Sequence, residues 1–238
     1  MLNMNTGHRV HARAERANDS YNTPAVAVRA LLAVEDVPTH VWEPCAGGGY
    51  IVAALQAVGH RVVATDLIRR RRTFDCTGGV DFLEQTKMPL NTSCIFTNPA
   101  FKIADKCVAK ALALAPQAYL LLRVGYLAGL RWKRFRPHLV RVHVFSPRLP
   151  MMHRKNHKGK KNENSAMDFA WYVFDGLADA DRDPQVCWLD WREHATAEEL
   201  ADVKRRRRLA AQQAKAEKAA KAASNLVSGS YDIYDANP

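Results

Sequence analysis

The run Asn98-Pro99-Ala100-Phe101 has residue types that suit chemistry at an amine. An amine on an aromatic ring is a poor nucleophile, because its lone pair is delocalised into the ring. The Asn98 side-chain oxygen and the Pro99 carbonyl are acceptors that would take its two N–H hydrogens and favour a pyramidal nitrogen. Phe101 offers a face for stacking a base, worth about 1–3 kcal/mol. On this run alone, a plain strand end with Phe101 in the core stays open.

A second run, Glu43-Pro44-Cys45-Ala46-Gly47-Gly48-Gly49, follows a short β-rich segment and precedes a helical pattern. Glycines let the backbone take positive φ and approach a ligand closely above a helix N-terminus. Asp66 ends the next β-rich segment, where a carboxylate commonly holds ribose hydroxyls. Together these features predict a nucleoside-bearing cofactor. Val52 stands where a dinucleotide fingerprint requires a third glycine, which disfavours NAD.

These residues resemble the class I S-adenosylmethionine-dependent methyltransferases, in particular phage-type DNA N6-adenine methyltransferases with an (Asn/Asp)-Pro-Pro-(Tyr/Phe) motif. The resemblance spans roughly residues 21–174 and implies S-adenosyl-L-methionine as the cofactor. It implies that the catalytic residues are Asn98, Pro99 and Phe101. The cofactor contacts it implies are Tyr21, Thr23, Glu43, Pro44, Cys45, Ala46, Gly47, Gly49, Asp66, Leu67, Asp81, Phe82 and Asn98.

Ala100 departs from the family motif, which has a second proline at this position. Alanine restores a backbone N–H and frees φ, so we expect a less rigid loop with less well preorganised acceptors. Reduced activity, or binding without catalysis, is the alternative that this residue keeps open.

The elements that position these runs alternate in a βαβ pattern typical of an α/β protein. We expect a Rossmann-like class I methyltransferase fold, with a mostly parallel seven-stranded sheet and an antiparallel edge pair. Thr23 and Pro24 are expected to open the first helix as N-cap and first helical residue. Strands are expected at 40–44, 61–66, 79–82, 93–97, 118–124, 140–145 and 168–174, and a further helix at 103–115.

The chain divides by composition into a loose arm at 1–20, a methyltransferase domain at 21–195 and a basic helical or disordered tail at 196–238. Thr196 and Glu199 form a capping box that predicts the start of the tail helix. Between Lys204 and Lys221 the tail has eight cations and one acid, which is most of the net charge of +11. Such a run binds phosphates without sequence preference.

Positive charge with interleaved aromatic residues favours nucleic acid as the partner, and we expect DNA. Two further basic segments are candidates, one containing Trp132, Phe135 and Arg136. Their predicted nucleic-acid contacts are Arg131, Lys133, Arg134, Arg154, Lys155, Lys158, Lys160 and Lys161. A solvated surface is the alternative for both segments.

Five cysteines without metal-ligand spacing predict no metal and a reduced, cytoplasmic compartment. Cys45 lies inside the glycine turn, but we expect a small filler rather than a nucleophile. No signal peptide or membrane span is expected. The function that these features favour is methyl transfer to adenine N6 in DNA. RNA adenine or protein glutamine methylation, and a degenerate nucleic-acid-binding module, remain alternatives.

Overall fold

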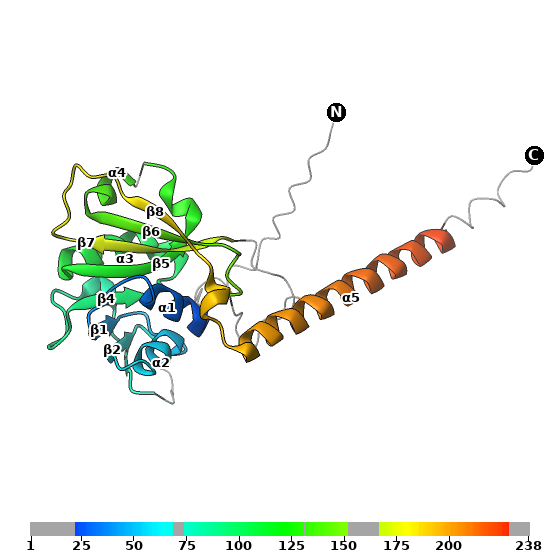
Figure 1. Cartoon of the computed structure of the whole chain (residues 1–238), viewed down its shortest axis with the longest axis horizontal. Helices are drawn as coiled ribbons and strands as arrows, with labels where there is room; N and C mark the ends of the chain where they lie inside the picture. The colour runs from blue at the N-terminus through cyan, green and yellow to red at the C-terminus, as the bar shows by residue number, and fades with distance from the viewer. Residues whose placement is uncertain (1–21, 69–73, 131, 152–166, 229–238) are drawn as a thin grey trace, which may run out of the picture. The chain divides into compact units, whose positions relative to one another are not determined.

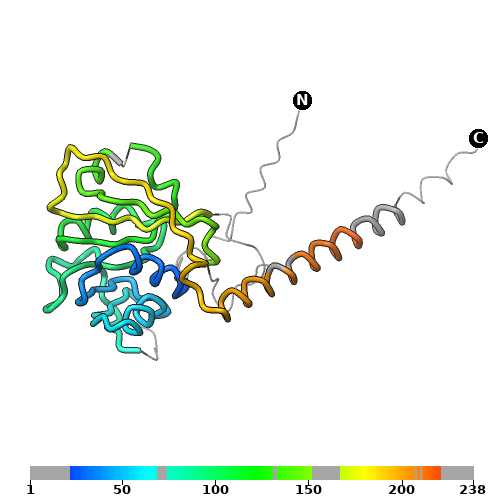
Figure 2. The backbone as a smooth tube through the Cα atoms, viewed as in Figure 1, coloured from blue at the N-terminus to red at the C-terminus, as the bar shows by residue number. Residues whose placement is uncertain are grey.

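The computed structural model describes residues 22–68, 74–130, 132–151 and 167–228. Its centre is an eight-stranded sheet with the order β3-β2-β1-β4-β5-β7-β6-β8 (Figure 1). Figure 2 traces the chain through this sheet, from the early strands in blue and cyan to the late strands in green and yellow.

The first five strands are parallel to one another. In the sheet, β2 and β3 lie on one side of β1, and β4 and β5 lie on the other side. Their order reverses between β1 and β4, as it does in Rossmann-like sheets. β1 and β4 are almost fully buried, because helices cover both faces of this half. These strands are β1 (His40–Glu43), β2 (Arg61–Asp66), β3 (Thr77–Gly78), β4 (Cys94–Thr97) and β5 (Gln117–Arg123).

The other half contains the predicted antiparallel pair, β6 (Leu139–Phe145) and β7 (Phe169–Asp175). β7 lies between β5 and β6, antiparallel to both. An eighth strand, β8 (Gln185–Leu189), pairs in parallel with β6, so the predicted pair is not at the edge. The fold class is confirmed, with one strand more than predicted. β8 was not predicted, although Val186-Cys187-Trp188-Leu189 is a short apolar run; only Leu189 in it is buried.

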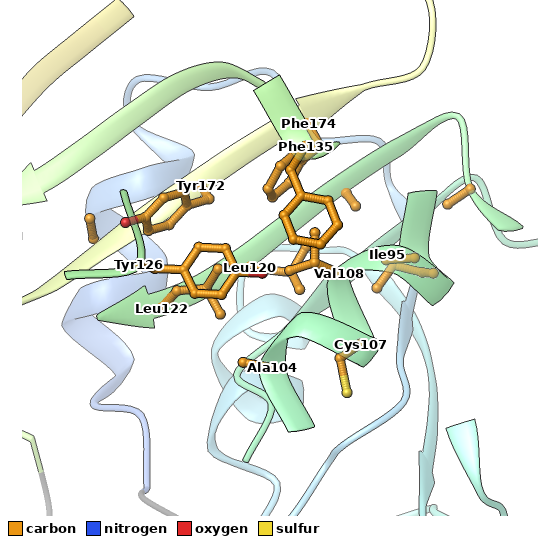
Figure 3. Packing of buried hydrophobic residues seen from close by; sticks show 14 of the residues in the cluster. Ile95, Ala104, Cys107, Val108, Leu120, Leu122, Tyr126, Phe135, Tyr172 and Phe174 are labelled. Atoms are coloured by element: carbon orange, nitrogen blue, oxygen red, sulfur yellow. The ribbon is translucent and has the colours of Figure 1, made fainter. Parts of the chain in front are cut away.

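Helices α1 (Ala25–Leu32) and α2 (Tyr50–Gln56) contact each other, and α1 packs on the face that contains Trp171. Trp171 donates its indole N–H to the Ala27 carbonyl at 2.8 Å. Helix α3 (Ala104–Leu114) packs on the opposite face of the sheet, against buried residues that include Leu120 (Figure 3). The remaining short helices are η1 (Phe82–Glu84), η2 (Phe101–Ile103), η3 (Val124–Leu127), α4 (Trp132–Phe135), η4 (Arg136–His138) and η5 (Trp191–His194).

A buried carboxylate ties the segment after α1 to β6. Glu35 accepts from Arg141 Nη2 at 2.5 Å and from His143 Nε2 at 2.6 Å. Burial acts to raise the pKa of Glu35, but the hydrogen bonds from His143 and Arg141 outweigh it and lower the pKa to about 2. The network therefore fixes the far half of the sheet against α1.

Two local predictions were wrong. Helix α1 begins at Ala25, with an extended Pro24 before it and no side-chain cap, because the Thr23 hydroxyl binds elsewhere. The third strand is Thr77–Gly78 rather than 79–82, since the β2 register pairs Asp66 with Gly78 and the Asp81 side chain then caps η1.

The tail helix forms a second unit, α5 (Ala197–Ser228). Its predicted capping box is confirmed: Glu199 N–H donates to Thr196 Oγ1 at 3.2 Å, and Thr196 N–H donates to a Glu199 carboxylate oxygen at 2.8 Å.

Four cations of α5 lie on one side of the helix and the acids lie on the other, together with Arg206. At about 100° per residue, the exposed side chains of Lys204, Arg208, Lys215 and Lys218 fall within an arc of about 80°. Glu198, Glu199, Asp202 and Glu217 lie on the opposite side of the same helical wheel. Asp202 also pairs with Arg205 and Arg206, each at 2.5 Å. We call Lys204, Arg208, Lys215 and Lys218 the cationic stripe.

Candidate active site

The candidate site lies at the carboxyl edge of the parallel strands, where β1 and β4 diverge. Glu43, Asp66 and Arg123 are the last residues of β1, β2 and β5, and Asn98 directly follows β4. The connections from β1 and β4 leave toward opposite faces of the sheet, which opens a crevice for ligands at this point. The fold thus brings together the two runs that the sequence singled out.

The glycine turn has the conformation that its sequence predicts. Gly47 and Gly49 have φ of 51° and 80°, and the Gly49 N–H donates to the Ala46 carbonyl at 2.7 Å. A Cβ on Gly49 would lie 2.4 Å from the ring of Phe74. Glycine is therefore required at position 49 by both the dihedral angle and the neighbouring ring.

Asp66 joins the glycine turn to the segment after β2. Its carboxylate accepts from the Gly47 N–H at 2.7 Å and from the Ile68 N–H at 2.8 Å. A carboxylate offers about four acceptor positions, and these two bonds hold it at the glycine turn. The neighbouring Leu67 is 60% exposed, which provides an apolar surface beside this carboxylate.

Glu43 links the glycine turn to the loop after β4. It is fully buried, and its Oε1 accepts from the Cys45 N–H at 2.9 Å and from the Thr97 hydroxyl at 2.5 Å. Burial raises the pKa of Glu43 to about 8, against the lowering effect of these two hydrogen bonds. Its Oε2 is also buried and accepts no hydrogen bond from the described residues. A buried oxygen in this state is suited to a polar ligand group.

Asn98 is held by the segment that precedes α1. Its amide nitrogen donates to the hydroxyl of Thr23, which is 3% exposed, at 3.0 Å. In the structure, Oδ1 is therefore the end of the amide that faces away from this hydroxyl. On the same segment, Asn22 approaches the glycine turn, and a Cβ on Gly48 would lie 3.2 Å from Asn22 Oδ1. The predicted N-terminal element therefore lies at the site, although Tyr21 is outside the described residues.

Ala100 has the backbone geometry that proline would impose. Its φ is −58°, within the range that a proline ring fixes, and its ψ is 132°. The Ile103 N–H donates to the Ala100 carbonyl at 3.0 Å and begins η2. The backbone at this position is thus compatible with a second proline.

Phe101 packs against two side chains from neighbouring strands. Its ring centroid is 5.7 Å from that of Phe169, and the Arg123 guanidinium carbon lies 3.9 Å from the Phe101 centroid. Arg123 and Phe169 are directly opposite each other on β5 and β7, so both side chains point to one face of the sheet. The predicted stacking surface is therefore covered by a guanidinium.

Asp81 and Phe82 lie after β3. The Asp81 carboxylate accepts from the Leu83 N–H at 2.9 Å. The Phe82 side chain is 3% exposed and packs edge-on against Trp42, with centroids 5.2 Å apart. Only the backbone of Phe82 is therefore placed to contact a ligand.

The Cys45 thiol lies beside Cys107. A hydrogen bond with Cys107, followed by burial, raises the pKa of Cys45 well above its ordinary value. A nucleophilic cysteine needs a lowered pKa, so the thiol is suited to packing, as the sequence predicted.

Basic side chains predicted to bind nucleic acid fall into two groups. Lys133 and Arg134 are exposed on α4. Arg131, Arg154, Lys155, Lys158, Lys160 and Lys161 lie outside the described residues.

Two neighbours on the same segment have structural roles instead. Phe135 is 3% exposed and belongs to the hydrophobic core, so it is not an interleaved surface aromatic residue. Arg136 donates to Asp183 at 2.7 Å.

An ion pair joins the two segments that flank residues 152–166. Arg148 Nε lies 2.6 Å from an Asp168 carboxylate oxygen, and both side chains are about half exposed. The Arg148 carbonyl also accepts from the buried Trp191 indole at 3.3 Å. Both flanks are thus held at the carboxyl edge of β6 and the start of β7.

Thr97, Phe74 and Arg123 contact the predicted site residues, but the sequence patterns did not indicate them. Thr97 immediately precedes the Asn98 run, so a hydroxyl at the buried end of a strand was the available signal. Phe74 and Arg123 contact residues distant in sequence, and no local pattern indicates such contacts.

No protein-family model matches the chain, and no curated protein matches its sequence. The chain is similar to several solved structures, including the following three. A predicted O-methyltransferase from Agrobacterium tumefaciens has 12% identity and a TM-score of 0.44, covering 70% of this chain and 85% of that one. A type I restriction-modification methyltransferase subunit from Streptococcus thermophilus has 12% identity and a TM-score of 0.43, and the match covers 70% of this chain and 47% of that one. A dimethyladenosine transferase from Plasmodium falciparum has 14% identity and a TM-score of 0.42, and the match covers 65% of this chain and 62% of that one.

Within the described ranges, no helix is long and apolar enough to cross a membrane. In the same part of the chain, no three His, Cys, Asp or Glu side chains cluster so as to hold a metal ion.

Proposed function

We propose that this chain transfers a methyl group from S-adenosyl-L-methionine to the exocyclic N6 of adenine in DNA. The observation that carries the proposal is the hydrogen bond from the Asn98 amide nitrogen to Thr23. It lies at the ends of β1 and β4, where the strand order of the sheet reverses. It leaves the amide oxygen as the acceptor end of Asn98, directly before Pro99. This is the arrangement that an aromatic amine requires.

The residues around the glycine turn fit this cofactor. Asp66 and Leu67 offer a carboxylate and an exposed apolar surface for its nucleoside. Glu43 offers a buried carboxyl with one oxygen that accepts nothing from the described residues, which suits the amino-acid group. The backbone after Asp81 would contact the adenine. When bound, the cofactor supplies an electrophilic methyl group on a sulfonium.

The chain's own residues would prepare the nitrogen for in-line attack. Asn98 Oδ1 and the Pro99 carbonyl accept the two N–H hydrogens, which makes the lone pair available. Phe101 holds the plane of the base. Catalysis then rests on positioning and on preorganised acceptors rather than on a strong base.

Charge favours a polyanionic substrate. The chain carries a net charge of +11. On α5, the cationic stripe extends over about 21 Å of exposed helix, and the acids lie on the opposite side. A one-sided line of cations matches the repeating phosphates of a nucleic-acid strand. We assign the stripe the role of sequence-independent phosphate contact.

The test is to incubate the protein with labelled S-adenosyl-L-methionine and, separately, unmodified DNA, RNA and protein extract, and to identify the methylated atom. We expect N6-methyladenine in DNA, and loss of transfer in Asn98→Ala with cofactor binding retained. Label in RNA or on glutamine would replace the substrate proposal. Cofactor binding without transfer to any substrate would support a degenerate binding module.

A further inference from the structure

Arg123 is the residue at the site whose contact the proposed reaction does not explain. Its guanidinium carbon lies 3.9 Å from the Phe101 centroid, which is a stacking distance. No carboxylate in the described part of the chain pairs with it, and the residue is exposed at the end of β5. A cation therefore covers the ring that the target base needs.

The contact is of a kind that a base can replace. A guanidinium is planar and stacks on aromatic rings, as a nucleobase does. Stacking of a base on an aromatic side chain is stronger than an exposed cation–π contact, so an incoming base would displace Arg123 from Phe101. The long, exposed side chain of Arg123 can lift, whereas Phe101 is backed by the buried Phe169.

We propose that Arg123 forms the upper, movable layer of a clamp for the target base, with Phe101 as the lower layer. The base enters between the two, and the guanidinium then stacks on its outer face beside the nucleotide's phosphate. The inference rests on the proposed function, because it assigns a positioning role within the same site. It predicts that the planarity of Arg123 is needed as well as its charge.

The test compares Arg123→Lys and Arg123→Ala, using an oligonucleotide that contains the methylated site. Lysine keeps the charge but lacks the planar face. We expect KM for the oligonucleotide to rise about fivefold in Arg123→Lys and further in Arg123→Ala, with kcat changed less than twofold. Arg182→Ala is the matched charge control, since Arg182 is exposed on the β7–β8 connection at the opposite edge of the sheet.

A second readout reports stacking directly. With 2-aminopurine at the target position, a base held between two planar groups is quenched, so we expect brighter fluorescence from the complex with Arg123→Lys than from the wild-type complex. The clamp alone would be overturned if Arg123→Lys had the wild-type KM and the wild-type 2-aminopurine fluorescence. It would also be overturned if Arg123→Ala raised KM no more than Arg182→Ala does. Absence of methyl transfer by the wild type would overturn the proposed function and the clamp with it.

Discussion

The amide nitrogen of Asn98 lies 3.0 Å from the hydroxyl oxygen of Thr23, although the two residues are 75 positions apart in the sequence. The contact joins the loop after β4 to the segment before α1. Because Thr23 is buried, its hydroxyl is not shared with solvent. The orientation of the Asn98 amide, which we propose to be catalytic, therefore depends on a residue outside the sheet.

Replacing Thr23 with valine is expected to lower kcat about tenfold, equivalent to about 1.4 kcal/mol. Valine has a similar shape but leaves the Asn98 N–H without this acceptor, so the amide is held less firmly. Thr23→Ser keeps the hydroxyl and is expected to behave like wild type. Steady-state kinetics and calorimetric cofactor titration provide the measurement. Loss of cofactor affinity with unchanged kcat would instead support the direct cofactor contact predicted from the sequence.

Ala100→Pro is expected to stabilise the protein by about 0.4–1 kcal/mol, because it restricts only the unfolded chain. The φ of −58° already suits proline. Ala100→Gly is expected to change stability in the opposite direction. Urea unfolding measures both, and kcat of Ala100→Pro is expected to rise as the acceptors become better preorganised. A lower midpoint for the proline variant would show that the loop rejects the ring.

The raised pKa of Glu43 predicts that the stability of the fold depends on pH. Its pKa is raised from 4.5 to about 8, so between these values the folded protein retains a proton that the unfolded chain loses. The stabilisation is complete below about pH 4.5 and is lost as pH rises through about 8.

The comparison variant is Glu43→Gln, which cannot titrate. The stability of wild type relative to this variant is expected to fall between pH 5 and pH 8.5 by on the order of a few kcal/mol. Urea unfolding at several pH values measures the difference. Parallel curves for the two proteins would show that Glu43 titrates normally.

The cationic stripe on α5 can be tested against a neighbouring pair with the same charge. In Lys204→Gln/Arg208→Gln, the slope of log affinity for DNA against log salt is expected to fall by about 1.8, since each lost phosphate contact removes about 0.9. The control is Arg205→Gln/Arg206→Gln, because these arginines pair with Asp202. Equal changes in the two double variants would mean that net charge alone matters.

Local patterns were sufficient for much of the fold and for part of the site. The strand at 61–66 and the capping box at Thr196 and Glu199 were predicted as observed, because adjacent residues determine them. The βαβ order also placed the glycine turn and Asn98 at one edge. The residues predicted to bind cofactor and nucleic acid stay predictions until they are tested.

What sequence patterns missed depends on contacts between distant segments. Thr23 was read as a helix cap because Thr-Pro is a good helix start, but the tertiary partner Asn98 takes its hydroxyl. The stacking of Arg123 on Phe101 needs the register of β5 against β7, which no single run contains. β8 is mostly exposed and forms only because β6 offers an edge to pair with.

The ion pair between Arg148 and Asp168 joins the two described segments that flank residues 152–166. Since these flanks are joined at 2.6 Å, a change in the length of the segment between them costs only the slowly growing entropy of a longer closed loop. Leu149 and Met151 are buried, so sequence changes that keep these two residues and the ion pair are expected to leave the strand register unchanged. The scaffold is thus suited to loop exchange, in which target preference is altered by grafting new sequences between two anchored ends.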